Sequence, residues 1–170
     1  MATLLAAPIL TFPDARLRQV AAEITQKQGL EKLRDCLIAT MQSGVGGVGI
    51  AAPQIGQLVR MVVVDCRGAR HPCAHHGLLC MVNPRIVTAS GHKLGREGCL
   101  SVPDLVATVS RNKNISVCYQ DVVLNTYQIE SSGFEARVMQ HEIDHLQGVL
   151  LIDRVTNVRD IVRRMAQHTA

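Results

Sequence analysis

The sequence His-Glu-Ile-Asp-His at residues 141–145 constrains the fold of this chain more than any other feature. On a helix, His141 and His145 lie one turn apart on the same face, so both imidazoles can reach one metal ion. Glu142 then stands beside the first ligand, where its carboxylate can take a proton from a water molecule at the metal. The motif therefore predicts a catalytic metal site on a helix, and the alternative is two surface histidines on an ordinary helix.

The flanking residues predict the helix that this motif needs. Ser132 and Glu135 have the spacing of a capping box, and the helical pattern begins at about Phe134. Gly148 is a natural end, because glycine commonly follows the last helical residue. The motif thus falls within a helix that begins and ends on recognisable signals.

A third protein ligand is expected upstream of this helix, because a catalytic metal site usually has three. No Glu follows His145, and no later His has the H-x-x-G-x-x-H spacing found in some zinc peptidases. Cys99, in REGCLSVPD, is the strongest upstream candidate, because Gly98 permits a close backbone approach and Pro103 favours an extended chain before it. The alternative is that Cys99 is a small buried apolar residue.

Glycines are concentrated in SGVGGVGIAAPQIG, residues 43–56. Gly44, Gly46 and Gly49 fit the dinucleotide-binding pattern G-x-G-x-x-G, which requires a strand before it and a helix after it. Here a helical pattern precedes the glycines and Pro53 interrupts the segment after them, so a nicotinamide or flavin cofactor is disfavoured. A flexible linker is also disfavoured, because AAPQIG is apolar and flexible linkers are rich in Gly and Ser.

Composition limits the classes of partner. The net charge of +4 is mild, and the densest basic cluster, Arg163-Arg164, is too small for a nucleic-acid footprint. No apolar run approaches the roughly 18 residues that a membrane span needs. The apolar start MATLLAAPIL lacks the basic residues of a secretory signal, and the six cysteines include no C-x-x-C pair. A reducing, cytoplasmic protein without a disulfide framework is therefore expected.

Hydrophobic periodicity outlines the elements. Helical patterns cover 13–24, 30–41 and 158–165. Strand-like patterns cover 61–66, 81–87, 115–119 and 125–130, with a loop at 67–77. Because strands and helices are segregated along the chain, we expect an α+β fold. No internal repeat or linker is found, so residues 1–170 are expected to form a single catalytic domain.

Three segments together resemble the signature motifs of the peptide deformylases, in the order of that family. They are GVGIAAPQ at 47–54, EGCLS at 97–101 and QHEIDHLQG at 140–148. PDARLRQVA near the start and GVLLIDR at 148–154 are also similar, so the resemblance covers nearly the whole chain. It implies small antiparallel sheets around a central helix that carries H-E-x-x-H. It also implies a metal-dependent hydrolase that removes the N-terminal formyl group from formyl-methionine of newly made proteins and releases formate.

The resemblance further implies roles for individual residues. Glu142 would act as general base and then as general acid, while Gln54 and the backbone N–H of Leu100 would bind the oxyanion. The metal would be ferrous iron, for which Zn²⁺, Ni²⁺ or Co²⁺ substitutes. Its implied ligands are Cys99, His141 and His145. The implied substrate-binding residues are Gly47, Val48, Gly49, Glu97, Arg137 and Val138.

The implied partners are N-formylmethionyl nascent peptides, met in the cytoplasm with a transient ribosome contact, without a membrane and without a specific nucleic acid. The glycines at 47 and 49 would let a peptide pair with the main chain as an added strand. Asp144 is expected to pair with Arg111 or Arg154 and so to orient the helix. The alternative for Asp144 is an exposed helix carboxylate.

Two positions depart from the pattern of this family. Arg137 lies one turn before His141, where relatives usually place an apolar residue that lines the pocket for the methionine side chain. Either the pocket accepts polar or acidic side chains, or the arginine stem packs while its head reaches water. Val106 stands where many relatives have an arginine that reaches toward the peptide, so contacts beyond the first residue are expected to be weaker.

Other interpretations stay open beside this one. Because of Arg137, a related hydrolase that acts on another N-acyl substrate is an alternative. Further alternatives are a non-catalytic protein that binds N-termini and a zinc endopeptidase. A second metal site in the loop is disfavoured against a solvated loop, because no C-x₂₋₄-C pair anchors it. The residues of that loop are Cys66, His71, Cys73, His75, His76 and Cys80.

Overall fold

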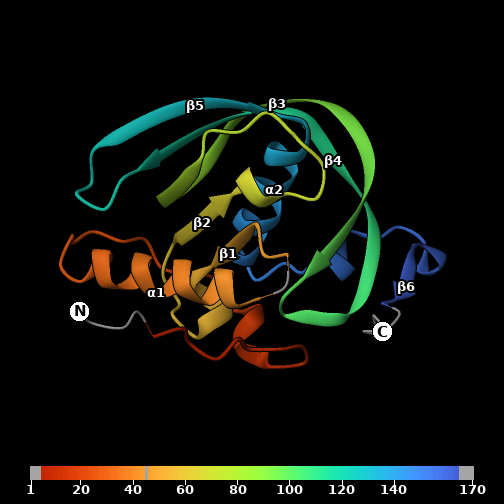
Figure 1. Cartoon of the computed structure of the whole chain (residues 1–170), viewed down its shortest axis with the longest axis horizontal. Helices are drawn as coiled ribbons and strands as arrows, with labels where there is room; N and C mark the ends of the chain where they lie inside the picture. Colours follow the sequence, from red (N-terminus) through yellow and green to blue (C-terminus); the bar gives the residue numbers. More distant parts are fainter. Residues whose placement is uncertain (1–4, 45, 165–170) are drawn as a thin grey trace.

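One antiparallel sheet wraps around a central helix in the computed structural model, which describes residues 5–44 and 46–164 (Figure 1). Within these residues the sheet has six strands, in the order β1-β2-β3-β4-β5, and β6 pairs with β4 outside this path. The strands are β1 (Gly49–Ala51), β2 (Met61–Asp65), β3 (Leu78–Cys99), β4 (Val102–Gln120), β5 (Thr126–Ser132) and β6 (Ile161–Arg163). The helices are α1 (Leu30–Ser43) and α2 (Gly133–His145). The α+β expectation is confirmed.

The long β3–β4 ribbon is the largest difference from the strands expected from sequence. The expected segments 81–87 and 115–119 lie inside strands of 22 and 19 residues. Residues 85–94 of β3 are exposed, so no alternation of apolar and polar side chains marks them as strand. The register shifts at three places along the ribbon, and such irregularities let a long ribbon bend. The ribbon therefore arches over α2, as Figure 1 shows.

Helix α2 fills the centre of the fold. It packs against β1, β2, β4 and β5, and every residue from Glu135 to His145 is buried. Ala136, Met139 and Ile143 contribute apolar surface to the main core cluster. The expected helix is confirmed and Gly148, with φ +70°, follows it, but the expected capping box is wrong. The side chain of Ser132 makes no cap hydrogen bond.

Glu135, the other half of the expected capping box, is used elsewhere. Its carboxylate accepts hydrogen bonds from the His76 backbone N–H at 2.7 Å and from the Ser131 hydroxyl at 2.8 Å. The side chain therefore fastens the loop after β2 to the start of α2. A long-range partner has replaced the local one that the sequence pattern indicates.

Two expected helices are wrong. Residues 13–24 contain only the short 3₁₀ turn Ala15–Arg18, because the backbone N–H groups of Ala21 and Ala22 donate to Leu146 and Leu58 instead of to the preceding turn. At the other end, the 3₁₀ turn Val158–Asp160 leads into β6, which pairs with the edge of β4. Met165, part of the expected C-terminal helix, lies outside the described residues.

The other helix, strand and loop segments expected from the sequence are confirmed. Helix α1 begins after Gly29, which has φ +82°, and ends at Gly44 as expected. Strands β2 and β5 match the segments 61–66 and 125–130 closely, and residues 67–77 are irregular beyond a short 3₁₀ turn. Among the described helices none is both long and apolar enough to cross a membrane.

Candidate active site

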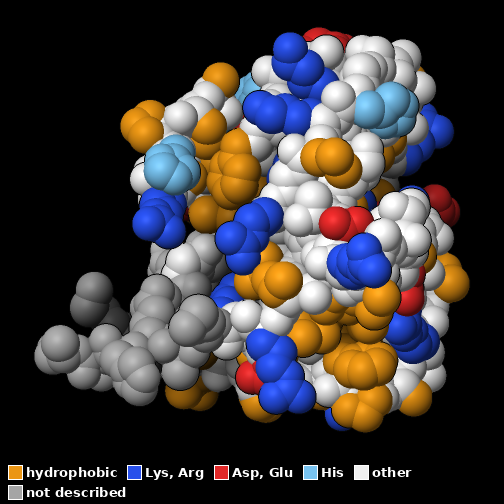
Figure 2. All heavy atoms as spheres, turned by 90° about the vertical axis from the view of Figure 1, so that its right-hand side faces the viewer, with side chains coloured by type: hydrophobic (Ala, Val, Ile, Leu, Met, Phe, Trp, Pro, Cys, Tyr) orange, Lys and Arg blue, Asp and Glu red, His pale blue; other side chains and the backbone are white. Residues whose placement is uncertain are grey.

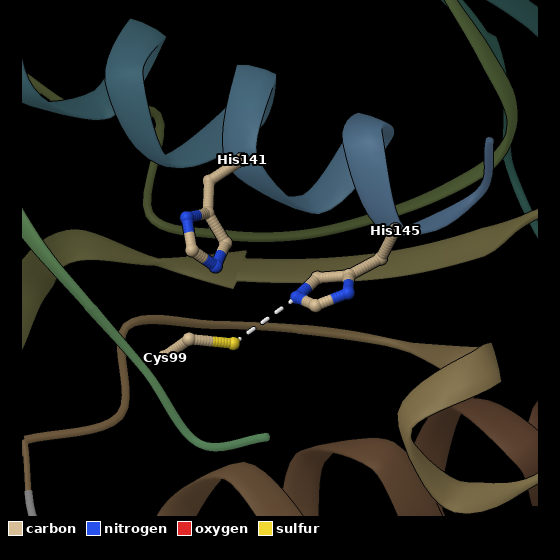
Figure 3. Close-up of side chains that lie close together, drawn as sticks. All are labelled: Cys99, His141 and His145. Carbon is tan, nitrogen blue, oxygen red and sulfur yellow. Dashed lines mark hydrogen bonds between the residues drawn. The ribbon is translucent and has the colours of Figure 1, made fainter. Parts of the chain in front are cut away.

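Helix α2 and the end of β3 bring three metal-ligand side chains together. His141 and His145 project from consecutive turns of α2 toward Cys99, as Figure 3 shows. The ligand atoms of the three residues all lie within 4.8 Å of one another. The Cys99 Sγ is 3.3 Å from His145 Nε2. The juxtaposition expected from sequence is thus present, and the interpretation of the histidines as surface residues is wrong.

The chemistry of these side chains fits a divalent metal ion. All three are buried, Cys99 is a free cysteine, and burial lowers the pKa of His145 well below its usual value, so its imidazole is neutral as ligation requires. The Nδ1 of His141 lies 2.9 Å from Glu97 Oε2, which leaves Nε2 for a metal. A carboxylate on the far nitrogen of a ligating histidine fixes the ring orientation and raises its basicity. No other group of three such residues gathers in the described part of the chain.

Glu142 lies beside this cluster with an unsatisfied carboxylate. The residue is 4% exposed, and its Oε2 has no hydrogen-bond partner among the described residues. Burial raises the pKa of Glu142 to about 7. An unpaired buried carboxylate costs stability, and such groups are found where a reaction needs them.

Gln54 reaches the cluster from a separate segment of the chain. It belongs to the 3₁₀ turn Ala52–Ile55, and its side chain is almost fully buried. Its Oε1 accepts a hydrogen bond from the backbone of Ala51 at 2.8 Å, which directs its Nε2 outward. That amide nitrogen donates to Ser101 Oγ at 3.1 Å and lies 3.7 Å from Cys99 Sγ. The amide N–H groups of Gln54 are thereby fixed next to the ligands.

The glycines of residues 43–56 make close approaches rather than a cofactor cradle. Gly49 opens β1, and a Cβ added there would lie 2.5 Å from Glu142 Oε1. A Cβ added at Gly47 would clash with the carbonyl oxygen of Met41. Since helix α1 precedes these glycines and a strand comes after them, the dinucleotide-binding alternative is wrong.

A chain of alternating charges fastens the ligand helix to the ribbon. Arg137 Nη1 donates to Glu97 Oε1 at 2.7 Å, and Arg111 donates to both oxygens of Glu97 at 3.0 Å. Arg111 also reaches Asp144 at 2.5 Å, and Arg154 pairs with the other oxygen of Asp144 at 2.5 Å. The prediction that Asp144 pairs with Arg111 or Arg154 is confirmed, because its carboxylate pairs with both guanidinium groups. The Asp144 side chain is 10% exposed, so it is not an exposed helix carboxylate.

Glu97 stands at the centre of this network. Burial alone would raise its pKa, but hydrogen bonds from His141 and Arg111 lower the pKa of Glu97 to about 2. The carboxylate is therefore ionised and able to hold the His141 ring. Only 7% of Glu97 is exposed, so its charge is compensated by side chains and not by water.

The guanidinium group of Arg137 does not reach water. The interpretation in which its stem packs while its head is solvated is therefore wrong. The residue is 8% exposed, and its guanidinium also donates to the carbonyl oxygens of Val109 at 2.9 Å and Lys93 at 2.5 Å. Gly95 provides the space, because a Cβ there would lie 2.8 Å from Arg137 Cζ. The arginine thus joins α2 to both strands of the ribbon.

The cluster opens into a pocket of about 390 Å³. Each residue expected at the site lines this pocket except His145, which lies deeper and is 1% exposed. The expected members are Gly47, Val48, Gly49, Gln54, Glu97, Cys99, Leu100, Arg137, Val138, His141 and Glu142. Sequence reasoning missed other lining residues, namely Gly46, Arg70, Arg96, Gly98, Phe134 and Arg164. Arg96 directly precedes the EGCLS segment and Gly98 lies within it, whereas no local signal marks Arg70 or Arg164.

The Cys/His loop is attached to the core rather than wholly solvated. His76 bonds Glu135 through its ring as well, with Nδ1 at 2.7 Å from the carboxylate. Cys73 packs against the main core cluster, and burial raises the pKa of the Cys66 thiol to about 12. These cysteines therefore behave as small apolar side chains.

A buried Cys/His/His cluster, an adjacent unpaired carboxylate and an open pocket define a metal-dependent hydrolase. The chain belongs to the polypeptide deformylase family, which its sequence matches over residues 6–160. It is a hydrolase that removes the N-terminal formyl group from newly made polypeptides. The alternatives of a zinc endopeptidase and of a non-catalytic binding protein are set aside.

Sequence relatives and solved structures agree with this assignment. Peptide deformylase 1 of Vibrio vulnificus is 42% identical over 151 residues, which cover 89% of this chain and 87% of that protein. The peptide deformylase of Thermodesulfovibrio yellowstonii is 38% identical, with 92% and 93% covered. The structure of the class I type b peptide deformylase from Acinetobacter baumannii with Met-Ala-Ser bound superimposes with a TM-score of 0.85 at 35% identity, covering 90% of this chain and 100% of that one. The Thermotoga maritima peptide deformylase gives a TM-score of 0.82 at 36% identity, with 90% and 99% covered.

Proposed function

We propose that Cys99, His141 and His145 hold one ferrous ion, for which Zn²⁺, Ni²⁺ or Co²⁺ can substitute, and that residues 1–170 form a single catalytic domain around it. The observation that carries the proposal is the buried cluster with the unpartnered Oε2 of Glu142 beside it. A divalent ion held there would supply Lewis acidity, lowering the pKa of a water molecule and polarising the formyl carbonyl.

The protein groups around the ion carry the proton and orient the substrate. Glu142 takes a proton from the attacking water and then delivers it to the leaving amine nitrogen, because its carboxylate has no other partner. The Nε2 of Gln54, aimed by the hydrogen bond that its Oε1 accepts from Ala51, donates to the developing oxyanion together with the backbone N–H of Leu100. Glu97 holds the ring of His141 in its ligating orientation.

The substrate is an N-formylmethionyl nascent peptide that lies along β1. This strand is at the edge of the sheet and pairs only with β2 among the described strands, so its other side can accept a peptide as an added strand. Gly47, Val48 and Gly49 supply this edge, and Glu97, Arg137 and Val138 line the pocket for the first side chain. The relative from Acinetobacter baumannii holds Met-Ala-Ser, which is what removal of the formyl group from formyl-Met-Ala-Ser leaves.

The cellular setting is inferred from that substrate. The enzyme works in the cytoplasm on chains that are still being made, and it contacts the ribosome transiently without recognising a specific nucleic acid. A net charge of +4 on 170 residues supports only a weak, non-specific attraction to RNA.

Formate release tests the proposed function directly. Anaerobically prepared, iron-loaded protein is mixed with formyl-Met-Ala-Ser, beside a Glu142→Ala variant whose iron content is measured. We expect rapid release by the wild type and a loss of about 10²–10⁴-fold in the variant at unchanged iron content, as for removal of a general base. Absence of formate with a folded, iron-loaded wild type would contradict the proposal.

A second candidate is a related hydrolase that acts on another N-acyl residue, and Arg137 is the observation that favours it because its charge lies at the pocket wall. We favour formyl-methionine, because the guanidinium is already paired with Glu97 and with backbone carbonyls. The two candidates are distinguished by comparing the turnover of formyl-Met and formyl-Glu peptides in the wild type and in Arg137→Leu. A wild-type preference for formyl-Glu that the substitution reverses would favour the second candidate.

A further inference from the structure

Three exposed arginines from separate segments surround the mouth of the active-site pocket. Arg70 lies in the loop after β2, Arg96 near the end of β3, and Arg164 directly after β6. All three line the pocket that contains the ligand cluster. On the face turned to the viewer in Figure 2, basic side chains predominate over acidic ones. The mouth is therefore positively charged although the protein as a whole is only mildly basic.

None of the three guanidinium groups is neutralised within residues 5–44 and 46–164, where no carboxylate forms an ion pair with them. The pocket contains two carboxylates of its own. Glu97 is held by Arg137 and Arg111, and Glu142 is buried beside the ligands. The charge at the mouth is thus available to a bound molecule.

Two of these arginines lie on the same side of β3. A Cβ at Gly98 would clash with Arg164 Nη2, so this guanidinium rests directly on the glycine next to Cys99. Arg96 is two residues before Gly98 on the same strand, and side chains two residues apart point to the same side. Strand β6, which pairs with Leu105–Ala107, brings Arg164 to this place. Two positive charges on one side of the strand at the pocket favour an anionic ligand there.

We propose that Arg70, Arg96 and Arg164 select polypeptides that carry Asp or Glu within the first few residues after the formylated one. This proposal rests on the proposed function, because the formyl group must reach the ligand cluster and the rest of the peptide must leave through the mouth. Side chains of the following residues therefore pass the arginines. Peptide carboxylates fit the position better than RNA phosphates do, because the arginines line the catalytic pocket itself and not a separate surface.

Competing formyl peptides test the proposal. The measured quantity is kcat/KM for formyl-Met-Asp-Glu relative to formyl-Met-Ala-Ser, in the wild type, in Arg70→Gln, Arg96→Gln and Arg164→Gln, and in the triple variant. The matched control is Arg163→Gln, an adjacent exposed arginine that lines a different hollow. We expect the wild type to favour the acidic peptide by about two- to fivefold for each arginine that it engages, mainly through KM.

The triple variant should lose this preference while Arg163→Gln keeps it, and raising the salt from about 0.05 to about 0.5 M should reduce it in the wild type. An equal ratio in the wild type and the triple variant would overturn the proposal. So would arginine variants that weaken binding of a single-stranded RNA oligonucleotide and leave the peptide ratio unchanged.

Binding of the product peptides separates this proposal from the proposed function. Dissociation constants of Met-Asp-Glu and Met-Ala-Ser, measured by calorimetry, require no turnover. If no peptide releases formate, the proposed function fails, and the ratio of these constants in the wild type and the triple variant still decides whether the arginines select acidic peptides.

Discussion

Gly49→Ala is expected to damage catalysis by a direct contact with Glu142. Gly49 is not in the left-handed region of backbone conformations, so alanine is not excluded there by strain. The new methyl group would lie 2.5 Å from Glu142 Oε1, 2.9 Å from Glu142 Cγ and 2.8 Å from Val138 Cγ1. The substitution therefore tests whether the glycine exists to leave room for the carboxylate.

The loss of activity depends on how far the added methyl group displaces Glu142. Comfortable contacts between heavy atoms begin near about 3.5 Å, so the Glu142 side chain has to retreat by roughly 1 Å. Misplacement of a catalytic group by that amount lowers the rate by about 10²-fold. Overpacking of a buried site also costs about 1–3 kcal/mol in the free energy of unfolding. The loss of turnover corresponds to about 2.7 kcal/mol in the activation free energy, so it lies near the upper end of the range expected for stability.

The assay combines formate release from formyl-Met-Ala-Ser with urea unfolding and metal content. Gly68→Ala is the matched control, because a Cβ there meets nothing within 4 Å and the backbone is not left-handed. Combining Gly49→Ala with Glu142→Asp, whose side chain is one methylene shorter, should cost less than the sum of the two single changes. Wild-type kcat in Gly49→Ala would refute this role of the glycine, as would an equal loss of kcat in Gly68→Ala.

Other substitutions test the network, the metal site and the core. Arg111→Met leaves the buried carboxylates of Glu97 and Asp144 without their shared partner, so it should lower the free energy of unfolding by about 3–5 kcal/mol in urea titrations. The control Arg34→Gln breaks the ion pair with Asp35, which is about one-third exposed, and should lower it by at most about 1 kcal/mol. Purified protein should contain one tightly bound metal ion per chain, as measured by elemental analysis. His141→Ala should lose this ion and His75→Ala should retain it. A second tightly bound metal ion per chain would contradict our interpretation of the Cys/His loop. Leu37→Ala, at a fully buried position of α1, should lower the free energy of unfolding by about 2–5 kcal/mol. Leu94→Ala, at a position that is 67% exposed, should lower it by about 0.5 kcal/mol or less. Equal losses in the two variants would contradict the burial of α1.

Sequence reasoning predicted the site best where its geometry is local. The spacing of His141, Glu142 and His145 has meaning only on a helix, and helix geometry alone fixes how the two rings lie. Cys99 lies 46 residues before His145, at the end of a strand whose preceding part is exposed. No hydrophobic periodicity predicts that this strand brings Cys99 to the helix. The resemblance of three motifs supplied what periodicity could not.

Where the prediction failed, contacts between distant segments had overridden local preference. Residues 13–24 have helical spacing, but the backbone N–H groups of Ala21 and Ala22 donate hydrogen bonds to the turn after α2 and to the segment before β2. Arg137 on an isolated helix would extend its head into water, and it is buried only because the ribbon closes over α2. The signal that could have revealed this is Gly95, a glycine inside a strand, which often marks a close approach.

The ion-pair network between α2 and the β3–β4 ribbon also bears on how the protein acquires its metal. Glu97, Arg111 and Asp144 hold these elements together through contacts that use none of the three ligand atoms. The conformational entropy of assembling the site is therefore lost when the chain folds and not when the ion arrives. Loading and release become local events at a preorganised site, and one ion can exchange for another while the chain stays folded.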